Sequence, residues 1–240
     1  MREVIVTGGG TGIGYAVAET FVRAGDRVTV TGRRKDVLEA AAERLGARHV
    51  AFDASDPVAV SAALDLLPER VDVLVNNAGG NADFDRSSAS ERSLADLAAA
   101  WRANLDANLL SAVLVTAALA PRLADDARVV GIGSIAARRG AGSYGAAKAA
   151  LEAWAADVAA ELGGRGITVN VVSPGLVPDT DFFRDRPMDA LVRNRVAETR
   201  NHRPGTPADI AAAVRFVTSP EAGHVTGQVI HVNGGAYLGR

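Results

Sequence analysis

The sequence predicts an α/β protein with a doubly wound parallel sheet, built as a single domain. Short apolar runs alternate with amphipathic helical patterns along the chain, which is typical of parallel sheets covered by helices on both faces. A glycine-rich turn joins the first predicted strand to the first predicted helix. The chain has 240 residues, of which 48% are hydrophobic, so it is long enough for one such domain with a sizeable core.

The first predicted strand, residues 4–6, leads directly into the glycine-rich residues 7–14, and a helix is predicted over residues 13–24. Glycines also serve ordinary tight turns. Between a strand and a helix, however, they favour a nucleotide loop, where backbone amides and the helix N-terminus bind a pyrophosphate. We expect cofactor contacts from the following residues of this turn: Gly8, Gly10, Thr11, Gly12, Ile13 and Gly14.

The second predicted strand, residues 27–31, is followed by Arg33 and Arg34. In a dinucleotide-binding fold, an acidic residue at this position binds the ribose 2′-hydroxyl, whereas an arginine accommodates a 2′-phosphate. The first acidic residue is Asp36. The pattern therefore favours NADP over NAD, with a solvated basic helix start as the alternative.

The alternation then continues with a helix, a strand, a helix and a strand, at residues 36–45, 49–52, 56–67 and 71–75. Ligands of such sheets bind at the carboxyl ends of the strands. Asp53, with Ala54 beside it, follows the third strand and either accepts a hydrogen bond from the adenine amino group or caps a turn. At the end of the fourth strand, we expect cofactor contacts from Asn77, Ala78 and Gly79.

A polar loop is predicted over residues 81–93 and a long helix over residues 94–119, which carries Asn104 and Asn108. The fifth strand, residues 128–133, ends at Ser134. This serine is not in a G-x-S-x-G turn, so a hydrogen-bonding role is favoured over a nucleophilic one.

Tyr144 and Lys148 are four residues apart, next to an alanine-rich helix predicted over residues 146–162, so their side chains share one helix face. A free phenol has a pKa near 10, and a neighbouring positive charge lowers it. We therefore expect Lys148 to lower the pKa of Tyr144 for proton transfer to or from a carbonyl group. The alternative is an ordinary surface pair on an amphipathic helix.

The remaining predicted elements are a strand over 167–172, a substrate lid over 176–203, a helix over 209–218 and a last strand over 228–232. The net charge of −2 gives no indication of nucleic-acid binding, and no cysteine is present. The four histidines lack metal-ligand spacing, so no metal site is expected. The longest apolar run, residues 109–120, is too short to span a bilayer, and no signal peptide is recognised. We expect a cytoplasmic protein without membrane contact.

Taken together, these motifs resemble the short-chain dehydrogenase/reductase (SDR) family over essentially the whole chain. The resemblance rests on Thr7-Gly8-x-x-x-Gly12-Ile13-Gly14, Asp53, Asn76-Asn77-Ala78-Gly79, Asn108, Ser134, Tyr144-x-x-x-Lys148, Asn170-x-x-Ser173-Pro174-Gly175 and Gly227-Gln228-x-Ile230-x-Val232-Asn233-Gly234-Gly235. It implies a Rossmann-type sheet of seven strands in the order 3-2-1-4-5-6-7 and a homotetramer. It also implies a catalytic tetrad of Asn108, Ser134, Tyr144 and Lys148, in which Tyr144 and Lys148 also contact the cofactor.

Two departures from the family pattern affect the site. Ser134 lies only ten residues before Tyr144, a shorter spacing than usual, so Ser143 stays a minor rival. The threonine that often follows the Pro-Gly turn is replaced by Asp179, and Thr180 comes one residue later. Around this turn the resemblance implies cofactor contacts from Pro174, Gly175, Val177 and Thr180.

The substrate is left open by the sequence. The pattern resembles 3-oxoacyl-[acyl-carrier-protein] reductases, and lid arginines could meet a carrier-protein- or CoA-bound substrate: Arg184, Arg186, Arg193, Arg195 and Arg200. A solvated mixed-charge surface is the alternative, because the lid also contains acidic residues. Other open functions are an NAD-dependent secondary-alcohol, steroid or sugar dehydrogenase, and a non-catalytic NADP-sensing regulator. An extended nucleotide-sugar epimerase is disfavoured by the short chain.

Overall fold

The computed structural model describes residues 1–85, 93–178, 180–183 and 188–239, and it confirms the predicted α/β fold. Its seven-stranded sheet has the order β3-β2-β1-β4-β5-β6-β7, and each pair of neighbouring strands is parallel. The strands are β1 (Glu3–Thr7), β2 (Arg27–Gly32), β3 (Arg48–Ala51), β4 (Val71–Asn76), β5 (Leu123–Ile132), β6 (Thr168–Pro174) and β7 (Val229–Val232). Between β1 and β4 the strand order reverses, which is where open α/β sheets form a ligand crevice.

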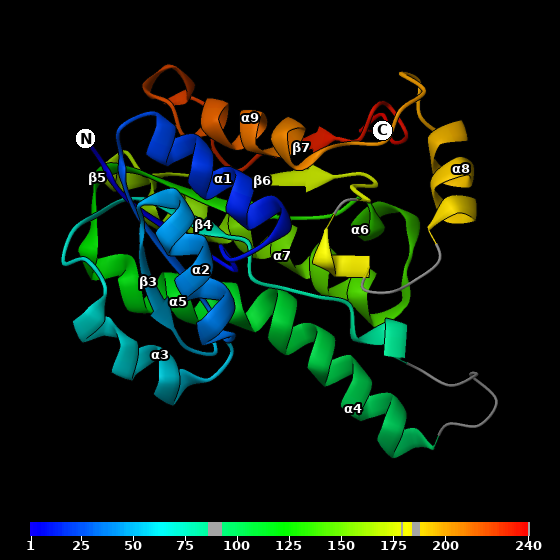
Figure 1. Ribbon diagram of the computed structural model, residues 1–240, viewed down its shortest axis with the longest axis horizontal. Coiled ribbons are helices and arrows are strands. Elements are labelled where there is room, and N and C mark those ends of the chain that lie inside the picture. The colour runs from blue at the N-terminus through cyan, green and yellow to red at the C-terminus, as the bar shows by residue number, and fades with distance from the viewer. Residues whose placement is uncertain (86–92, 179, 184–187, 240) are drawn as a thin grey trace.

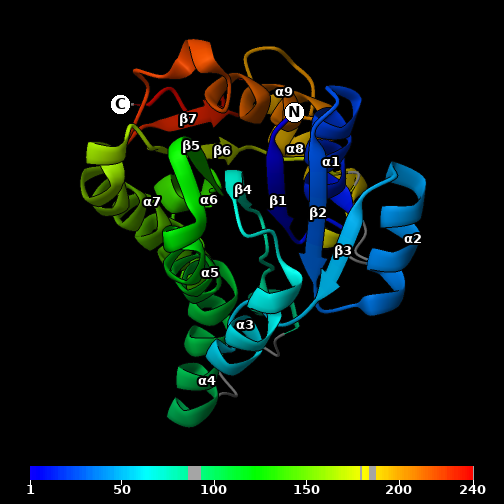
Figure 2. The same cartoon turned by 90° about the vertical axis from the view of Figure 1, so that its left-hand side faces the viewer.

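Helices cover both faces of this sheet (Figures 1 and 2). They are α1 (Gly12–Arg23), α2 (Lys35–Leu45), α3 (Pro57–Ala63), α4 (Leu94–Leu105), α5 (Ser111–Leu119), α6 (Ala136–Arg139), α7 (Gly142–Leu162), α8 (Asp189–Ala197) and α9 (Pro207–Val217). One apolar core packs α1, α2 and α9 against the sheet, and a second packs α3, α5 and α7 against the opposite face. The strands are therefore buried on both faces, as parallel strands require.

Some elements differ from the sequence prediction. Helix α7 begins at Gly142 rather than at residue 146, so Tyr144 lies in its first turn. Strand β5 begins at Leu123, and its pairing with β4 shifts register between Val71 and Val73, so the extra residues are accommodated by an irregularity. The lid, to which the sequence assigned no helix or strand, contains α8 and a short 3-10 helix, Asp181–Phe183.

The single long helix predicted over residues 94–119 is interrupted. A π-helical turn, Asp106–Leu110, separates α4 from α5. Such turns widen a helix locally and often occur at functional sites.

This combined stretch, Leu94–Arg122, is one helix of 29 residues that is long and apolar enough to cross a membrane by length and composition. The sequence prediction considered only residues 109–120 and so underestimated its length. The stretch packs against α7 and α3 and brings two buried asparagines, Asn104 and Asn108, into the protein interior. Core helices pass the same test, so this feature is weak evidence for membrane contact.

Candidate active site

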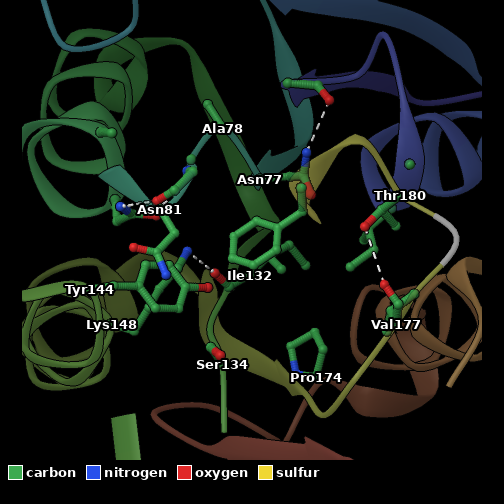
Figure 3. A pocket seen from close by; sticks show the side chains of 18 of the residues that line it. Asn77, Ala78, Asn81, Ile132, Ser134, Tyr144, Lys148, Pro174, Val177 and Thr180 are labelled. Carbon is green, nitrogen blue, oxygen red and sulfur yellow. Dashed lines mark hydrogen bonds between the residues drawn. The ribbon is translucent and has the colours of Figure 1, made fainter. Parts of the chain in front are cut away.

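A cavity of about 1230 Å³ lies at the carboxyl ends of the strands and exceeds the roughly 300–1,000 Å³ of common small-molecule pockets. It brings together all the residues that the sequence singled out for catalysis or cofactor contact, from both halves of the sheet (Figure 3). These are Gly8, Gly10, Thr11, Gly12, Ile13, Gly14, Arg33, Arg34, Asp53, Ala54, Asn77, Ala78, Gly79, Asn108, Ser134, Tyr144, Lys148, Pro174, Gly175, Val177 and Thr180.

The glycine-rich turn is held by the end of β4. The amide group of Asn77 donates hydrogen bonds to the carbonyl oxygens of Thr7 and Gly8, at 3.0 and 3.1 Å. In return, the Thr7 hydroxyl accepts from the backbone N–H groups of Asn77 and Ala78, at 3.0 and 2.9 Å. A Cβ atom on Gly14 would lie 2.3 Å from the Gly8 carbonyl oxygen, so only glycine fits there. The amide nitrogen of Asn77 is thus occupied in holding the turn.

The N-terminus of α1 has the properties of an anion site. Its N-cap residue, Thr11, makes no side-chain capping hydrogen bond. The first N–H groups of a helix lack intrahelical partners, and together with the helix dipole they favour a phosphate. Thr180 of the lid lies over this turn, because a Cβ on Gly12 would meet its side chain at 3.2 Å.

Arg33 and Arg34 extend from the end of β2 into exposed positions on the cavity rim. Arg34 forms an ion pair with Asp181 of the lid at 3.0 Å, and Arg33 lies 3.8 Å from the Asp53 carboxylate. Both arginines are thus exposed cations beside the place where the sequence predicted an adenosine phosphate.

Asp53 has the turn-capping geometry that the sequence analysis kept as the alternative. One carboxylate oxygen accepts from the backbone N–H and the hydroxyl of Ser55, at 2.9 and 2.7 Å. Burial tends to raise the pKa of Asp53, but the hydrogen bonds from Ser55 and the charge of Arg33 outweigh it, so the pKa lies below its usual value. The second oxygen, directed toward Arg33, remains beside the cavity.

Tyr144 and Lys148 share one face of α7, and the Lys148 ammonium lies 6.0 Å from the centre of the Tyr144 ring. The Lys148 Nζ donates a 2.7 Å hydrogen bond to the Ile132 carbonyl oxygen at the end of β5 (Figure 3). Burial raises the pKa of Tyr144 to about 12, against an opposing hydrogen bond with Ser134, and burial lowers the pKa of Lys148 to about 8. The expected lowering of the Tyr144 pKa is therefore wrong for the protein alone, because desolvation dominates.

Ser134 stands directly after β5, beside the Tyr144 phenol. Its oxygen accepts a hydrogen bond from the Ala136 N–H at 3.2 Å. Its own proton therefore remains available for donation, toward Tyr144 or toward another oxygen in the cavity.

Asn108 lies in the π-helical turn and is 2% exposed. Its amide group makes a reciprocal pair with Gly80, donating to the carbonyl oxygen at 2.8 Å and accepting from the N–H at 3.2 Å. A Cβ on Gly79 would lie 2.6 Å from the Asn108 oxygen and 3.5 Å from the Lys148 Nζ. Asn108, Lys148 and Gly79 thus converge at one point of the cavity.

The two rivals from the sequence analysis have other partners. Asn104 and Ser143 hydrogen-bond to each other at 2.9 Å and are not among the residues that line the cavity. This geometry favours Asn108 and Ser134 as the cavity-facing members of each pair.

Phe84, which the sequence did not single out, also lines the cavity, together with Phe182 and Phe183 of the lid. Phe182 of the lid packs against Tyr144 and Phe84, with ring centres 5.5 and 5.4 Å apart, and Phe183 extends this group at 5.0 Å. No periodicity connects residue 84 with residues 182–183, so this contact required the fold. Together they form an apolar wall beside the phenol.

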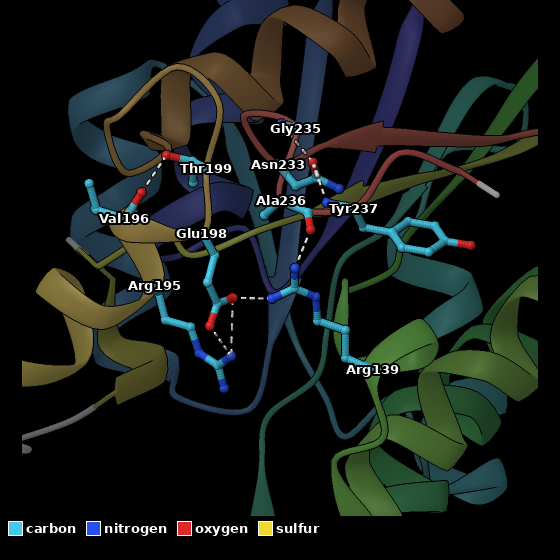
Figure 4. A network of polar contacts seen from close by, with 9 residues as sticks. All are labelled: Arg139, Arg195, Val196, Glu198, Thr199, Asn233, Gly235, Ala236 and Tyr237. Atoms are coloured by element: carbon cyan, nitrogen blue, oxygen red, sulfur yellow. Dashed lines mark hydrogen bonds and ion pairs between the residues drawn. The ribbon is translucent and has the colours of Figure 1, made fainter.

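Arg139 of α6 joins three segments on the same rim (Figure 4). It forms an ion pair with Glu198 near the end of α8 and donates to the Ala236 carbonyl oxygen. Arg195 also contacts Glu198, at 3.1 Å. Of the other lid arginines, Arg193 and Arg200 do not line the cavity, and Arg184 and Arg186 lie outside the described residues, as does Asp179.

The arrangement fits a dinucleotide. The turn after β1 is rich in glycines, and the uncapped N-terminus of α1 follows it. Exposed arginines lie at the end of β2, where the adenosine ribose is expected. On the same cavity, a buried phenol, a hydroxyl and an amine surround a space where a carbonyl group can accept a proton.

Known proteins resemble this chain over nearly its full length. The sequence model of a family described as enoyl-(acyl carrier protein) reductase matches residues 8–237. A Mycobacterium tuberculosis protein named as an oxidoreductase is 36% identical over 238 residues, covering 98% of this chain and 97% of that protein. The 3-oxoacyl-[acyl-carrier-protein] reductase of Escherichia coli is 33% identical over 247 residues, covering 99% and 98%. A short-chain dehydrogenase from Burkholderia cenocepacia, solved in complex with NADP, superposes with a TM-score of 0.84 at 36% identity, covering 98% and 97%.

Proposed function

Because the chain belongs to the short-chain dehydrogenase/reductase family, we propose that it is an NADP(H)-dependent oxidoreductase that reduces a ketone or oxidises the corresponding secondary alcohol. The observation that carries the proposal is the convergence of Ser134, Tyr144 and Lys148 on the cavity that also contains the glycine-rich turn. When bound, NADPH would supply the hydride for the carbonyl carbon.

In this mechanism the protein stabilises and protonates the carbonyl oxygen. The Ser134 hydroxyl and the Tyr144 hydroxyl donate hydrogen bonds to that oxygen, where negative charge develops during reduction. Tyr144 then transfers its proton. Lys148 contributes a positive charge behind the phenol, and Asn108 holds the backbone of Gly80 at the same end of the cavity.

The raised pKa of Tyr144 gives the phenol the protonation state that carbonyl reduction requires at neutral pH. A phenol with a pKa of about 12 stays protonated there, which is the form that donates a proton. Alcohol oxidation needs the phenolate, whose formation burial disfavours. We therefore expect the oxidation rate to rise with pH.

NADP is proposed over NAD because Arg33 and Arg34 are exposed at the end of β2. A 2′-phosphate would compete with Asp181 for Arg34, and charge-assisted hydrogen bonds of this kind are worth about 1.5–3 kcal/mol. The remaining predicted cofactor contacts, from Gly8 to Thr180, border the same cavity. NAD use stays the alternative.

We further propose a 3-oxoacyl thioester as substrate. The apolar wall of Phe84, Phe182 and Phe183 suits an acyl chain beside Tyr144. Arg139 and Arg195 on the rim provide two positive charges against the one negative charge of Glu198, which suits a carrier-protein- or CoA-bound phosphate. Residues 176–203 would act as the substrate lid, since several of them border the cavity. A steroid, sugar or other secondary alcohol is the alternative.

The protein is proposed to work in the cytoplasm as a homotetramer, without nucleic-acid or membrane partners. Leu94, Leu97 and Trp101 share one face of α4 and are 85%, 41% and 41% exposed, and this apolar patch supports self-association.

A carbonyl panel tests the substrate class. Purified protein is assayed with NADPH and with NADH against acetoacetyl thioesters, cyclic ketones, quinones and sugars. Thioester reduction with NADPH is the expected result. Activity confined to another carbonyl class would reject the thioester, and tight NADPH binding without turnover on any compound would reject the enzymatic proposal in favour of a cofactor-sensing regulator.

A further inference from the structure

We propose that Asp83, Ser143 and Asn104 form a hydrogen-bonded network that positions Tyr144 for proton transfer. The inference rests on the proposed function, because it assigns Tyr144 as the proton donor. These three side chains come from the 3-10 helix Ala82–Asp85, the first turn of α7 and the end of α4. They are positioning residues, since each acts on Tyr144 through the backbone of α7.

The first turn of α7 needs an external hydrogen-bond acceptor. Helix N–H groups in the first turn have no intrahelical partner, and Tyr144 lies two residues after the helix start at Gly142. The N-cap residue, Ala141, makes no side-chain capping bond. Instead, the carboxylate of Asp83 accepts the Tyr144 N–H at 3.2 Å. The residue that carries the phenol is thus tied by its own backbone to Asp83.

The direction of each hydrogen bond in the network is fixed by its neighbours. The Ala82 N–H can only donate, so the atom that faces it at 3.0 Å is the Asn104 carbonyl oxygen. The Asn104 amide nitrogen must then donate to the Ser143 oxygen, at 2.9 Å. The Ser143 proton is left to donate to Asp83, at 2.9 Å.

The Asp83 carboxylate consequently accepts from at least the Ser143 hydroxyl and the Tyr144 N–H. The hydroxyl lies 2.9 Å from one carboxylate oxygen and 3.2 Å from the other, which also accepts the Tyr144 N–H at 3.2 Å. An asparagine at position 83 has a single acceptor oxygen, which could take both donors only at 3.2 Å. It would lose the 2.9 Å hydrogen bond from Ser143 and the negative charge, although it has the same shape as aspartate. The negative charge also lies at a helix N-terminus, where it is favourable.

Two side chains of the network are buried and Asp83 is half-buried, and the network connects the elements that carry the predicted catalytic residues. Ser143 and Asn104 are 1% and 0% exposed. The backbone carbonyl of Asn104 accepts from the Asn108 amide at 2.9 Å, so the same residue contacts both the Asn108 side chain and the start of α7. A Cβ on Gly142 would lie 3.1 Å from the Asp83 carboxylate, so a glycine there lets the two segments approach closely.

The test uses Asp83→Asn, Ser143→Ala and Asn104→Leu in the full-length protein. Misplacing a reacting group by about 1 Å can cost roughly a hundredfold in rate. We expect kcat to fall about ten- to hundredfold in each variant, with the Kd for NADPH unchanged. Asp106→Asn is the matched control, because Asp106 is exposed on the same helical stretch and its side chain makes no hydrogen bond to the three network residues. In a Tyr144→Phe background, the network substitutions should cause no further loss of turnover.

A second readout needs no substrate. The chain has three tyrosines, so protein labelled with ¹³C at the tyrosine Cζ gives three signals, and Tyr144→Phe assigns one of them. The Tyr144 signal should shift in the three network variants, while those of Tyr15 and Tyr237 stay in place. If wild-type turnover depends on Tyr144 but the variants keep full kcat and an unshifted signal, the positioning role is overturned. If the signal shifts but no wild-type turnover is found on the carbonyl panel, the network stands as a tether of Tyr144, and the proposed function fails instead.

Discussion

Lys148 gives the most quantitative prediction, because its amine is charged in water but almost fully enclosed in the protein. The side chain is 5% exposed and donates to the Ile132 carbonyl oxygen. Burial lowers its pKa from 10.5 to about 8. At about 1.4 kcal/mol per pH unit, this difference corresponds to roughly 3 kcal/mol of folding free energy.

The direction in which the free energy of unfolding changes with pH follows from proton binding. Between pH 8 and 10.5 the unfolded chain keeps the lysine proton, whereas the folded protein loses it. The penalty for burying the charged amine is therefore fully present below pH 8 and is relieved as the pH rises. Relative to a Lys148→Met variant, the wild-type protein should gain about 2 kcal/mol in unfolding free energy between pH 7 and pH 9.5.

Urea unfolding of both proteins at several pH values measures this difference directly, since shifts in other groups largely cancel between them. A second measurement uses ¹³C-labelled lysine, because the chain contains only Lys35 and Lys148. Lys35→Met assigns the two side-chain signals, and the Lys148 signal should titrate near pH 8. Parallel stability curves for the two proteins, or a Lys148 titration above pH 10, would refute the burial argument.

Three further predictions concern other parts of the site and fold. Arg34→Ala should raise the KM for NADPH about ten- to hundredfold, because one charge-assisted contact with the 2′-phosphate is lost, while the KM for NADH stays within twofold. Equal changes in the KM for both cofactors would contradict the 2′-phosphate assignment. Gly79→Ala should lower the free energy of unfolding by about 1–3 kcal/mol and reduce turnover, because the new methyl group would displace the Asn108 amide from Gly80. Thermal unfolding measures the effect, with Gly163→Ala as the control because open space surrounds Gly163. Asp209→Ala should destabilise the protein by about 1 kcal/mol at pH 7 through loss of the α9 capping box. The hydrogen bond from Arg203 holds the pKa of Asp209 well below its usual value. The stability difference between the wild-type protein and Asp209→Ala should therefore shrink as the pH falls below about 4. A stability difference that does not change with pH would show that the carboxylate charge is irrelevant.

Much of the cavity could be predicted from local signals in the sequence, whereas the strand order followed from the resemblance to the family. Many predicted contacts follow directly after a buried strand, as Gly8 follows β1 and Ser134 follows β5. Parallel strands bring such positions to one edge of the sheet. The identity of the residues around each strand end was therefore enough to group them in one site. Asn108, Tyr144 and Lys148 instead lie in helical segments.

Other features depend on contacts between distant segments and left no local signal. The π-helical turn at Asn108 lies in an alanine- and leucine-rich stretch that reads as ordinary helix. Asp83 lies in a stretch that reads as a polar loop, and its role follows only from its position beside the start of α7. The direction of the Tyr144 pKa shift was wrong, because spacing shows that Lys148 is near but does not show how completely the phenol is buried.

The central claim is that Tyr144 donates a proton in an NADPH-dependent carbonyl reduction. The most direct test compares NADPH oxidation by the wild-type protein and by Tyr144→Phe, with an acetoacetyl thioester and the other carbonyl compounds of the panel, together with NADPH binding by both proteins. General acid catalysis contributes about a hundred- to ten-thousandfold, so the variant should lose at least a hundredfold in kcat while its Kd for NADPH is unchanged. Equal turnover by the two proteins would contradict the assignment of Tyr144.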